Sequence, residues 1–332
     1  MPRITRHRIT RTRIRQYGIT SARMKGSGRP ALTAPVALGL AAVTGLALTA
    51  CGGSTSKNPL NSGAAKGTVV VGSGNFPESE LLAEIYAQAL TAKGVKVTRK
   101  FNIGTREVYY PELVKGTISV VPEYNGALLS YLSPSSTAAT TSEVNSALAG
   151  KLPSSVKALQ SSAAQDSDSV TVTAATAARD HLKTIADLGP HAKDMTFGGP
   201  TEFKTRADGL TGLHKNYGLT FKGFDSLDES GPITIAALKN GKVQAADLFT
   251  TTPQIVTDHF VVLSDPKNDF AAQNVVPVVG AKAVSSAAQN ALNAVSAKLT
   301  TATLLQMDKQ IGIDHADYAT VAKSWLSRSG LG

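Results

Sequence analysis

The chain has 332 residues, of which 34 are Lys or Arg and 24 are Asp or Glu, giving a formal charge of +10 at pH 7. Nine of the cations and none of the acids lie in residues 1–50, so the rest of the chain carries 25 basic and 24 acidic residues. A nucleic-acid-binding domain needs a basic face on its folded part. The near-neutral remainder does not favour that class.

The N-terminal segment resembles the signal of a bacterial lipoprotein. A basic region leads into an uncharged stretch rich in Ala, Leu and Gly at 31–50, and the only cysteine, Cys51, follows it. In such signals the cysteine thiol takes the lipid after cleavage. We therefore expect a signal peptide at 1–50, lipidation at Cys51 and a flexible linker at 51–67, with the protein held at the extracytoplasmic face of the membrane. The alternative is a buried thiol after a short membrane helix.

The basic region itself allows two interpretations. It begins either at residue 1 or at Met24, after an upstream segment of residues 1–23.

Strands and helices alternate along residues 68–332. Asn75-Phe76-Pro77-Glu78 is expected to open a helix, because proline suits the first turn and a carboxylate favours the positive helix end; Gly94 is expected to end it. Another helix is expected at 143–152, after a polar loop. Strands are expected at 68–72, 95–101, 118–121, 170–174, 195–198, 221–224, 243–249, 260–263 and 275–279. This alternation predicts an α/β fold with largely parallel sheets.

The last part of the chain has one expected strand after residue 265, too few for a sheet of its own. It is therefore expected to return to the first unit. The predicted arrangement has one lobe at 68–166 plus 265–332 and a second at 167–264. Two crossovers, near 165–169 and 263–275, join them.

Six motifs at the expected strand ends, where open α/β sheets bind ligands, carry a family resemblance. They are Val71-Gly72-Ser73-Gly74-Asn75-Phe76-Pro77-Glu78, Asn102-Ile103-Gly104-Thr105, Pro122-Glu123-Tyr124-Asn125-Gly126, Glu202-Phe203-Lys204-Thr205-Arg206-Ala207-Asp208-Gly209, Asp247-Leu248-Phe249-Thr250-Thr251-Thr252 and Leu263-Ser264-Asp265-Pro266-Lys267-Asn268. The chain resembles the substrate-binding subunits of ABC importers for glycine betaine, choline and related quaternary ammonium compounds. The resemblance implies a two-lobed periplasmic-binding-protein fold of type 2, with a ligand cleft between the lobes and hinge closure. It also implies a monomer that serves a membrane permease and a separate ATPase subunit.

The resemblance also implies site residues. A quaternary ammonium has no N–H, so aromatic faces hold it by cation–π attraction, and an arginine takes a carboxylate at the other end. Tyr124 would be a cage wall and Arg206 would bind the anionic end. The alternatives are a core tyrosine and an inter-loop ion pair, for example with Asp208. The full set of expected ligand-binding residues is Asn75, Phe76, Thr105, Tyr124, Arg206, Phe249, Thr250, Gln273 and Asn274.

The chain departs from the betaine-cage pattern at several positions. It has Gly74 where the family often has lysine, Ala127 where it has threonine, and Phe249 in place of a tyrosine. Another cage tyrosine is replaced near Val170, and a Pro-Pro-Tyr by residues 271–274. These departures indicate a larger or more polar ligand: choline, carnitine, an amino-acid betaine such as ergothioneine, or another small amine or acid.

Two other function classes compete with transport. A sensor or structural lipoprotein would keep the fold without delivering a solute. A hydrolase would need a nucleophile motif such as Gly-x-Ser-x-Gly, and Ser73 in Gly-Ser-Gly lacks that context. The sequence contains no Walker motif, and its histidines lack metal-ligand spacing. We therefore expect a binding protein that is not an enzyme and has no cofactor or metal.

Overall fold

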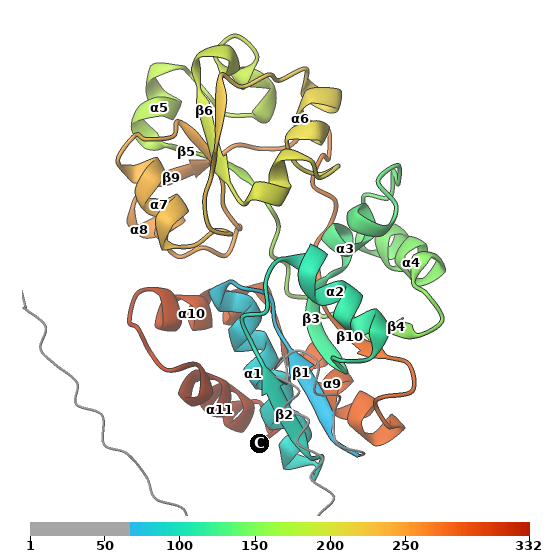
Figure 1. Ribbon diagram of the computed structural model, residues 1–332. Helices are drawn as coiled ribbons and strands as arrows, with labels where there is room; N and C mark the ends of the chain where they lie inside the picture. The colour runs from blue at the N-terminus through green and yellow to red at the C-terminus, as the bar shows by residue number, and fades with distance from the viewer. Residues whose placement is uncertain (1–66) are drawn as a thin grey trace, which may run out of the picture. The chain divides into compact units, whose positions relative to one another are not determined.

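The computed structural model describes residues 67–332 (Figure 1). The expected signal peptide at 1–50, the lipidation site Cys51 and nearly all of the expected linker lie outside these residues. Within the described residues, no helix has the length and the hydropathy needed to cross a membrane.

Two five-stranded sheets form the framework of this part of the chain. The first has the order β2-β1-β3-β10-β4 and consists of β1 (Val69–Gly72), β2 (Val97–Lys100), β3 (Val120–Tyr124), β4 (Val156–Ala158) and β10 (Val275–Gly280). The second has the order β7-β6-β8-β5-β9 and consists of β5 (Val170–Thr173), β6 (Thr196–Gly199), β7 (Gly223–Ser226), β8 (Ala245–Asp247) and β9 (Phe260–Val262).

Strand direction differs from the sequence-based expectation. In the first sheet β1 runs parallel to β2 and β3, whereas β10 is antiparallel to both β3 and β4. In the second, β6 runs parallel to β7 and β8, whereas β5 is antiparallel to β8 and β9. The sheets are mixed, so the prediction of largely parallel sheets was wrong. The chain leaves each sheet at the end where the parallel strands finish, and it enters the other sheet at the corresponding end. The entering strand, β5 or β10, therefore runs antiparallel to its neighbours.

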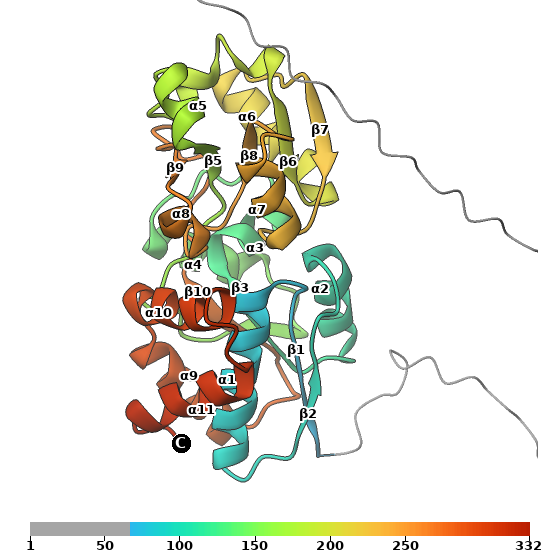
Figure 2. The same cartoon turned by 90° about the vertical axis from the view of Figure 1, so that its left-hand side faces the viewer.

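Helices accompany both sheets (Figures 1 and 2). In the parts of the chain that form the first sheet they are α1 (Pro77–Ala92), α2 (Arg106–Lys115), α3 (Asn125–Leu132), α4 (Thr141–Lys151), α9 (Ser286–Lys298), α10 (Thr301–Gly312) and α11 (Tyr318–Arg328). Between β5 and β9 they are α5 (Ala174–Arg179), α6 (Leu210–Tyr217), α7 (Pro232–Lys239) and α8 (Gln254–Thr257), with the 3-10 turns η1 (Ile185–Leu188), η2 (Ala192–Asp194) and η3 (Thr201–Lys204). The α/β architecture predicted from the sequence is confirmed.

Helix α1 shows how local sequence sets an element. Phe76 is its N-cap with extended backbone, Pro77 occupies the first turn, and Glu78 lies in the same turn. After the helix, Gly94 has a φ of 76°, a left-handed conformation that glycine adopts without a Cβ penalty. The predicted helix is confirmed at both ends.

The C-terminal helices α9, α10 and α11 pack against α1, 200 residues earlier in the chain (Figure 2). Their apolar side chains, including Trp325 and Leu292, share one core with Leu81 and Ile85 of α1. The C-terminal half of α10, with Asp308 and Ile311, thereby lies beside the first turn of α1, which matters for the site below.

The chain passes between the sheets twice, from β4 to β5 and from β9 to β10. The two crossing segments are bonded to each other. Gln165 and Asn274 form an antiparallel bridge, and the Asp166 N–H donates to the Gln273 carbonyl at 3.1 Å. The two crossing segments are therefore paired with each other where the chain passes between the sheets.

Candidate ligand-binding site between the two sheets

Segments that follow β1, β2, β3, β6, β7 and β8, together with the crossing segments, surround a small cavity. Its volume is about 10 Å³, about the space of one water molecule. The residues that line it are Phe76, Arg106, Tyr109, Tyr124, Ala127, Asp166, Asp168, Arg206, Glu229, Phe249 and Gln273. They come from the parts of the chain that form both sheets, and six of them have charged or amide side chains, whereas four are aromatic.

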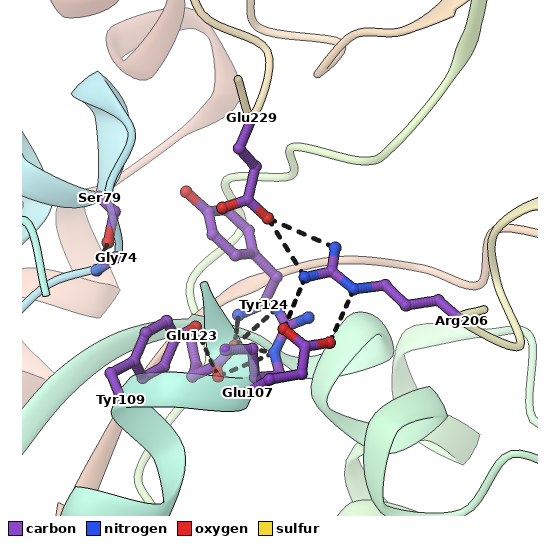
Figure 3. Close-up of polar contacts among 9 residues, drawn as sticks. Gly74, Ser79, Glu107, Tyr109, Glu123, Tyr124, Arg206 and Glu229 are labelled. Atoms are coloured by element: carbon purple, nitrogen blue, oxygen red, sulfur yellow. Dashed lines mark hydrogen bonds and ion pairs between the residues drawn. The ribbon is translucent and has the colours of Figure 1, made fainter. Parts of the chain in front are cut away.

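Three aromatic rings meet on one side of this cavity. The Phe76 and Phe249 ring centroids lie 4.9 Å apart at 62°, and those of Phe76 and Tyr124 lie 6.1 Å apart at 35°. Phe76 is held by the β1–α1 loop, in which the Gly74 N–H donates to Ser79 Oγ at 2.9 Å (Figure 3). Aromatic faces attract cations, and tetraalkylated ones in particular. The geometry therefore brings together three of the residues expected from the sequence.

Tyr124 also has a polar role. Its hydroxyl donates to Glu78 Oε1, and Thr251 donates to Glu78 Oε2 at 2.6 Å. Burial, together with the Glu78 and Asp166 carboxylates, raises the pKa of Tyr124 well above its usual range. The hydroxyl therefore keeps its proton and links the first sheet to the β8–α8 loop through Glu78.

Arg206 lies between two carboxylates from different parts of the fold (Figure 3). Its Nε and Nη2 donate to Glu107 of α2 at 3.0 and 3.1 Å, and Nη1 and Nη2 donate to Glu229 Oε1 at 3.3 Å. Burial opposes ionisation of Glu107, but the Arg206 guanidinium lowers the pKa of that carboxyl to about 2. A ligand carboxylate would have to compete with these two side chains for Arg206. The partner is not Asp208, which the sequence alternative named.

A second buried ion pair lies beside the first. Arg106 Nε donates to Glu123 Oε1 at 3.0 Å and Arg106 Nη2 to Glu123 Oε2 at 3.1 Å. The Tyr109 hydroxyl donates to the same carboxylate at 2.8 Å, and Glu123 is fully buried. Sequence reasoning did not assign Arg106 or Glu123 to the site. The available signal was a carboxylate at the end of an apolar strand, which is costly to bury unless it is paired.

Buried carboxylates outnumber the two arginines. Asp166 accepts from Thr250 Oγ1 at 3.1 Å and from the Thr251 N–H at 3.0 Å. Asp168 Oδ2 accepts from Gln273 at 3.1 Å, whereas its Oδ1 has no hydrogen-bond partner among residues 67–332. Burial, followed by the charge of Glu78, raises the pKa of Asp166 well above its usual range. An excess of buried acid favours a cationic guest over an anionic one.

The remaining expected residues lie around the cavity without lining it. With its amide oriented to satisfy both ends, Asn75 donates to the Gly104 carbonyl at 3.2 Å and to Glu229 at 3.1 Å. Thr105 is the residue before the first turn of α2, without a capping side-chain hydrogen bond, and Thr250 donates to Asp166. Asn274 accepts from Thr141 at 2.8 Å and donates to the Ser162 carbonyl at 3.0 Å. Phe76, Tyr124, Arg206, Phe249 and Gln273 are the expected residues that reach the cavity.

Comparison with known proteins agrees with the resemblance seen in the motifs. A family model described as the substrate binding domain of ABC-type glycine betaine transport system matches residues 67–328. The glycine betaine-binding protein YehZ of Escherichia coli (strain K12) is 27% identical over 277 residues, covering 79% of this chain and 90% of that protein. The ergothioneine transport permease/ergothioneine binding protein EgtU of Helicobacter pylori (strain G27) is 24% identical over 276 residues, covering 79% of this chain. Here the chain spans about half, 48%, of that protein's length.

A solved structure described as a glycine betaine/carnitine/choline ABC transporter shares the fold. Its TM-score is 0.62 at 21% identity, and the match covers 79% of this chain and 99% of that chain. The predicted periplasmic-binding-protein fold is thereby confirmed. Because the family model matches well over half of the sequence, the chain belongs to the family of substrate-binding domains of ABC-type glycine betaine transport systems.

Proposed function

We propose that this protein binds a small organic cation of the quaternary ammonium type and delivers it to the permease of an ABC importer, without a catalytic step. Glycine betaine, choline, carnitine and other betaines are the candidate ligands. One observation carries the proposal: the rings of Phe76, Tyr124 and Phe249 meet beside buried carboxylates. Aromatic faces and unpaired acid together suit a cation that has no N–H to donate.

Among these candidates, the charges favour a ligand without a carboxylate. Arg206 already donates four hydrogen bonds to Glu107 and Glu229, and Arg106 is paired with Glu123. A betaine would have to displace one of these carboxylates from its arginine. A choline-like cation needs no such exchange, so we expect choline to bind more tightly than glycine betaine.

Delivery would use motion of two lobes, 68–166 plus 265–332 and 167–264, about the paired crossing segments. The Arg206–Glu107 ion pair joins the η3–α6 loop of the second lobe to α2 of the first, so it would break when the lobes separate. Closure on a ligand would form such contacts between the lobes, and the permease would bind the closed form.

Membrane attachment is part of the proposal. We infer cleavage before Cys51, lipidation of its thiol and a monomeric protein outside the cytoplasmic membrane, in contact with a permease and its ATPase. Cys51→Ser should abolish palmitate labelling and leave an unprocessed precursor. Labelling that persists in this variant would contradict the assignment of Cys51.

Isothermal calorimetry of the purified protein with choline, glycine betaine, carnitine and ergothioneine tests the ligand class. A thermal-shift series serves as a second readout, because a ligand at a hundred times its Kd adds about 2.7 kcal/mol of stability. Binding of a solute without a quaternary ammonium group in preference to all four compounds would overturn the proposal. It would favour the alternatives, a different small polar ligand or a sensor role.

A further inference from the structure

A second cavity adjoins the first and shares Phe76, Phe249 and Glu229 with it. Its volume is about 90 Å³, enough for several water molecules or a small alkylated group. Its apolar lining comes from the two shared phenylalanines and from Pro232, Ile235 and Ile311. We call it the Asp308 cavity, after the acid of α10 that lines it.

Asp308 is 4% exposed, and neither of its carboxylate oxygens has a hydrogen-bond partner within residues 67–332. The neighbouring polar group is another acid, Glu78, whose own oxygens accept from Tyr124 and Thr251. Two carboxylates can share a hydrogen bond only when one of them is protonated. Asp308 therefore has no basic or donor side chain to balance an ionised state.

The charges that act on Asp308 all have the same sign. Burial, then the Glu78 charge, a hydrogen bond shared with the Glu78 carboxyl group and the Asp166 charge, raise the pKa of Asp308 well above its usual range. Tyr124 and Glu229 are the other titratable groups at this place, and no Lys, Arg or His lines the cavity in the described chain. An isolated buried carboxylate is costly, so this position takes up either a proton or a cation.

The side chains that line the Asp308 cavity determine which kind of cation can bind there. A metal ion needs several oxygen or nitrogen ligands in a close shell, and no such group of acids, histidines or cysteines occurs among residues 67–332. Phenylalanine, isoleucine and proline side chains instead suit the carbon substituents of an ammonium group, and the rings of Phe76 and Phe249 add cation–π attraction.

We propose that the Asp308 cavity is a second ammonium subsite, for a protonated amine or alkylated ammonium group on a ligand whose first cationic head lies at the Phe76, Tyr124 and Phe249 rings. This inference rests on the proposed function, because it extends the same binding site. Phe76 and Phe249 line both cavities, so a short alkyl chain passing these rings would join the two heads. Compounds with two cationic ends should then bind more tightly than those with one.

Two probes of matched length test this subsite by calorimetry on the purified protein. They are pentyltrimethylammonium and aminobutyltrimethylammonium with the amine at the chain end, which differ in a terminal methyl against a terminal ammonium. The doubly charged probe should bind at least about tenfold more tightly, because its ammonium pairs with a desolvated carboxylate. Its binding should also release protons, seen as a heat that changes between buffers of different ionisation enthalpy.

Asp308→Asn should remove most of this preference and the proton release, while leaving pentyltrimethylammonium within about threefold of its original Kd. Asp314→Asn, the same change at an exposed acid just beyond α10, is the matched control and should keep the preference. If Asp308→Asn does not fold, the affinity ratio and proton release of the unaltered protein still decide the question.

Equal affinities of the two probes for the unaltered protein would overturn the second subsite and leave the proposed function in place. A preference that survives in Asp308→Asn would likewise overturn it. Failure of both probes to bind would instead contradict the proposed ligand class, and the subsite with it.

Discussion

The two ends of the candidate site differ in whether their buried carboxylates are paired with an arginine. At one end, which we call the arginine end, three carboxylates pair with a guanidinium: Glu123 with Arg106, and Glu107 and Glu229 with Arg206. At the other, the acidic end, Glu78, Asp166 and Asp308 lie together with hydroxyls and backbone donors but no base. A paired buried charge holds the fold together, because removing one partner leaves the other uncompensated. An unpaired acid is instead available to a cationic ligand.

The largest expected effect comes from removing a buried ion pair at the arginine end. Arg106→Met would leave the fully buried Glu123 without its guanidinium partner, and we expect a loss of about 3–5 kcal/mol in the free energy of unfolding. Urea unfolding followed by circular dichroism measures it. Lys115→Met is the control on the same helix, because its ion pair with Glu112 is exposed and such pairs contribute about 0–1 kcal/mol. Equal losses in both variants would mean that the buried pair does not stabilise the fold.

A smaller effect is expected on binding at the aromatic rings. Tyr124→Ala should weaken choline binding by about 1–2 kcal/mol, roughly five- to thirtyfold in Kd, because a cation–π face is lost. Tyr124→Phe keeps the face and should lose much less, although Glu78 then loses a donor. Calorimetry on both variants separates these roles. If Tyr124→Ala lowers the melting temperature while the folded protein keeps its affinity, Tyr124 is a core tyrosine and not a cage wall.

Removing one carboxylate partner of Arg206 tests whether a ligand carboxylate can bind this arginine. Glu107→Gln removes one of its two carboxylate partners, so a ligand carboxylate no longer competes with that charge. We expect the affinity for glycine betaine to rise relative to that for choline by about fivefold, the scale of a partly exposed ion pair. The readout is the ratio of the two Kd values. An unchanged ratio would place the carboxylate of a betaine away from Arg206.

The smallest expected effect is the pH dependence of stability at the acidic end. Because the folded pKa of Asp308 lies above its unfolded value near 3.8, the folded state binds the extra proton, and stability falls as the pH rises above that value. Asp308→Asn removes this fall. We expect its melting temperature to exceed that of the original protein by about 2–4 °C at pH 8, with little difference at pH 4.

Glu107 provides the opposite sign. Its folded pKa is lowered to about 2, so its contribution is present above the unfolded value of 4.5 and is lost as the pH falls toward 2. We therefore expect the melting temperatures of Glu107→Gln and Asp308→Asn, each taken relative to the original protein, to change in opposite directions between pH 2 and 8. Parallel curves would contradict the distinction between the two ends.

Parts of the site could be predicted because they follow directly from strand ends. Phe76, Tyr124 and Phe249 each lie at a strand end or within four residues after it, in the motifs that carry the family resemblance. Arg106 and Glu123 could not be paired in advance. They lie 17 residues apart on different elements, and only the fold of α2 over β3 brings the guanidinium to the carboxylate.

The amino-acid sequence by itself determined most of the elements and their order, because proline, glycine and apolar periodicity act within a few residues; the short strand β4 was not among those expected. It also determined the family, through motifs at consecutive strand ends. Only the tertiary structure decided the direction of β5 and β10, since that depends on the edge at which the chain enters each sheet. It likewise decided the partners of Arg206, 99 and 23 residues away, and the burial of Asp308 beside Glu78. Burial and charge balance arise between segments distant in the chain, and no local pattern encodes them.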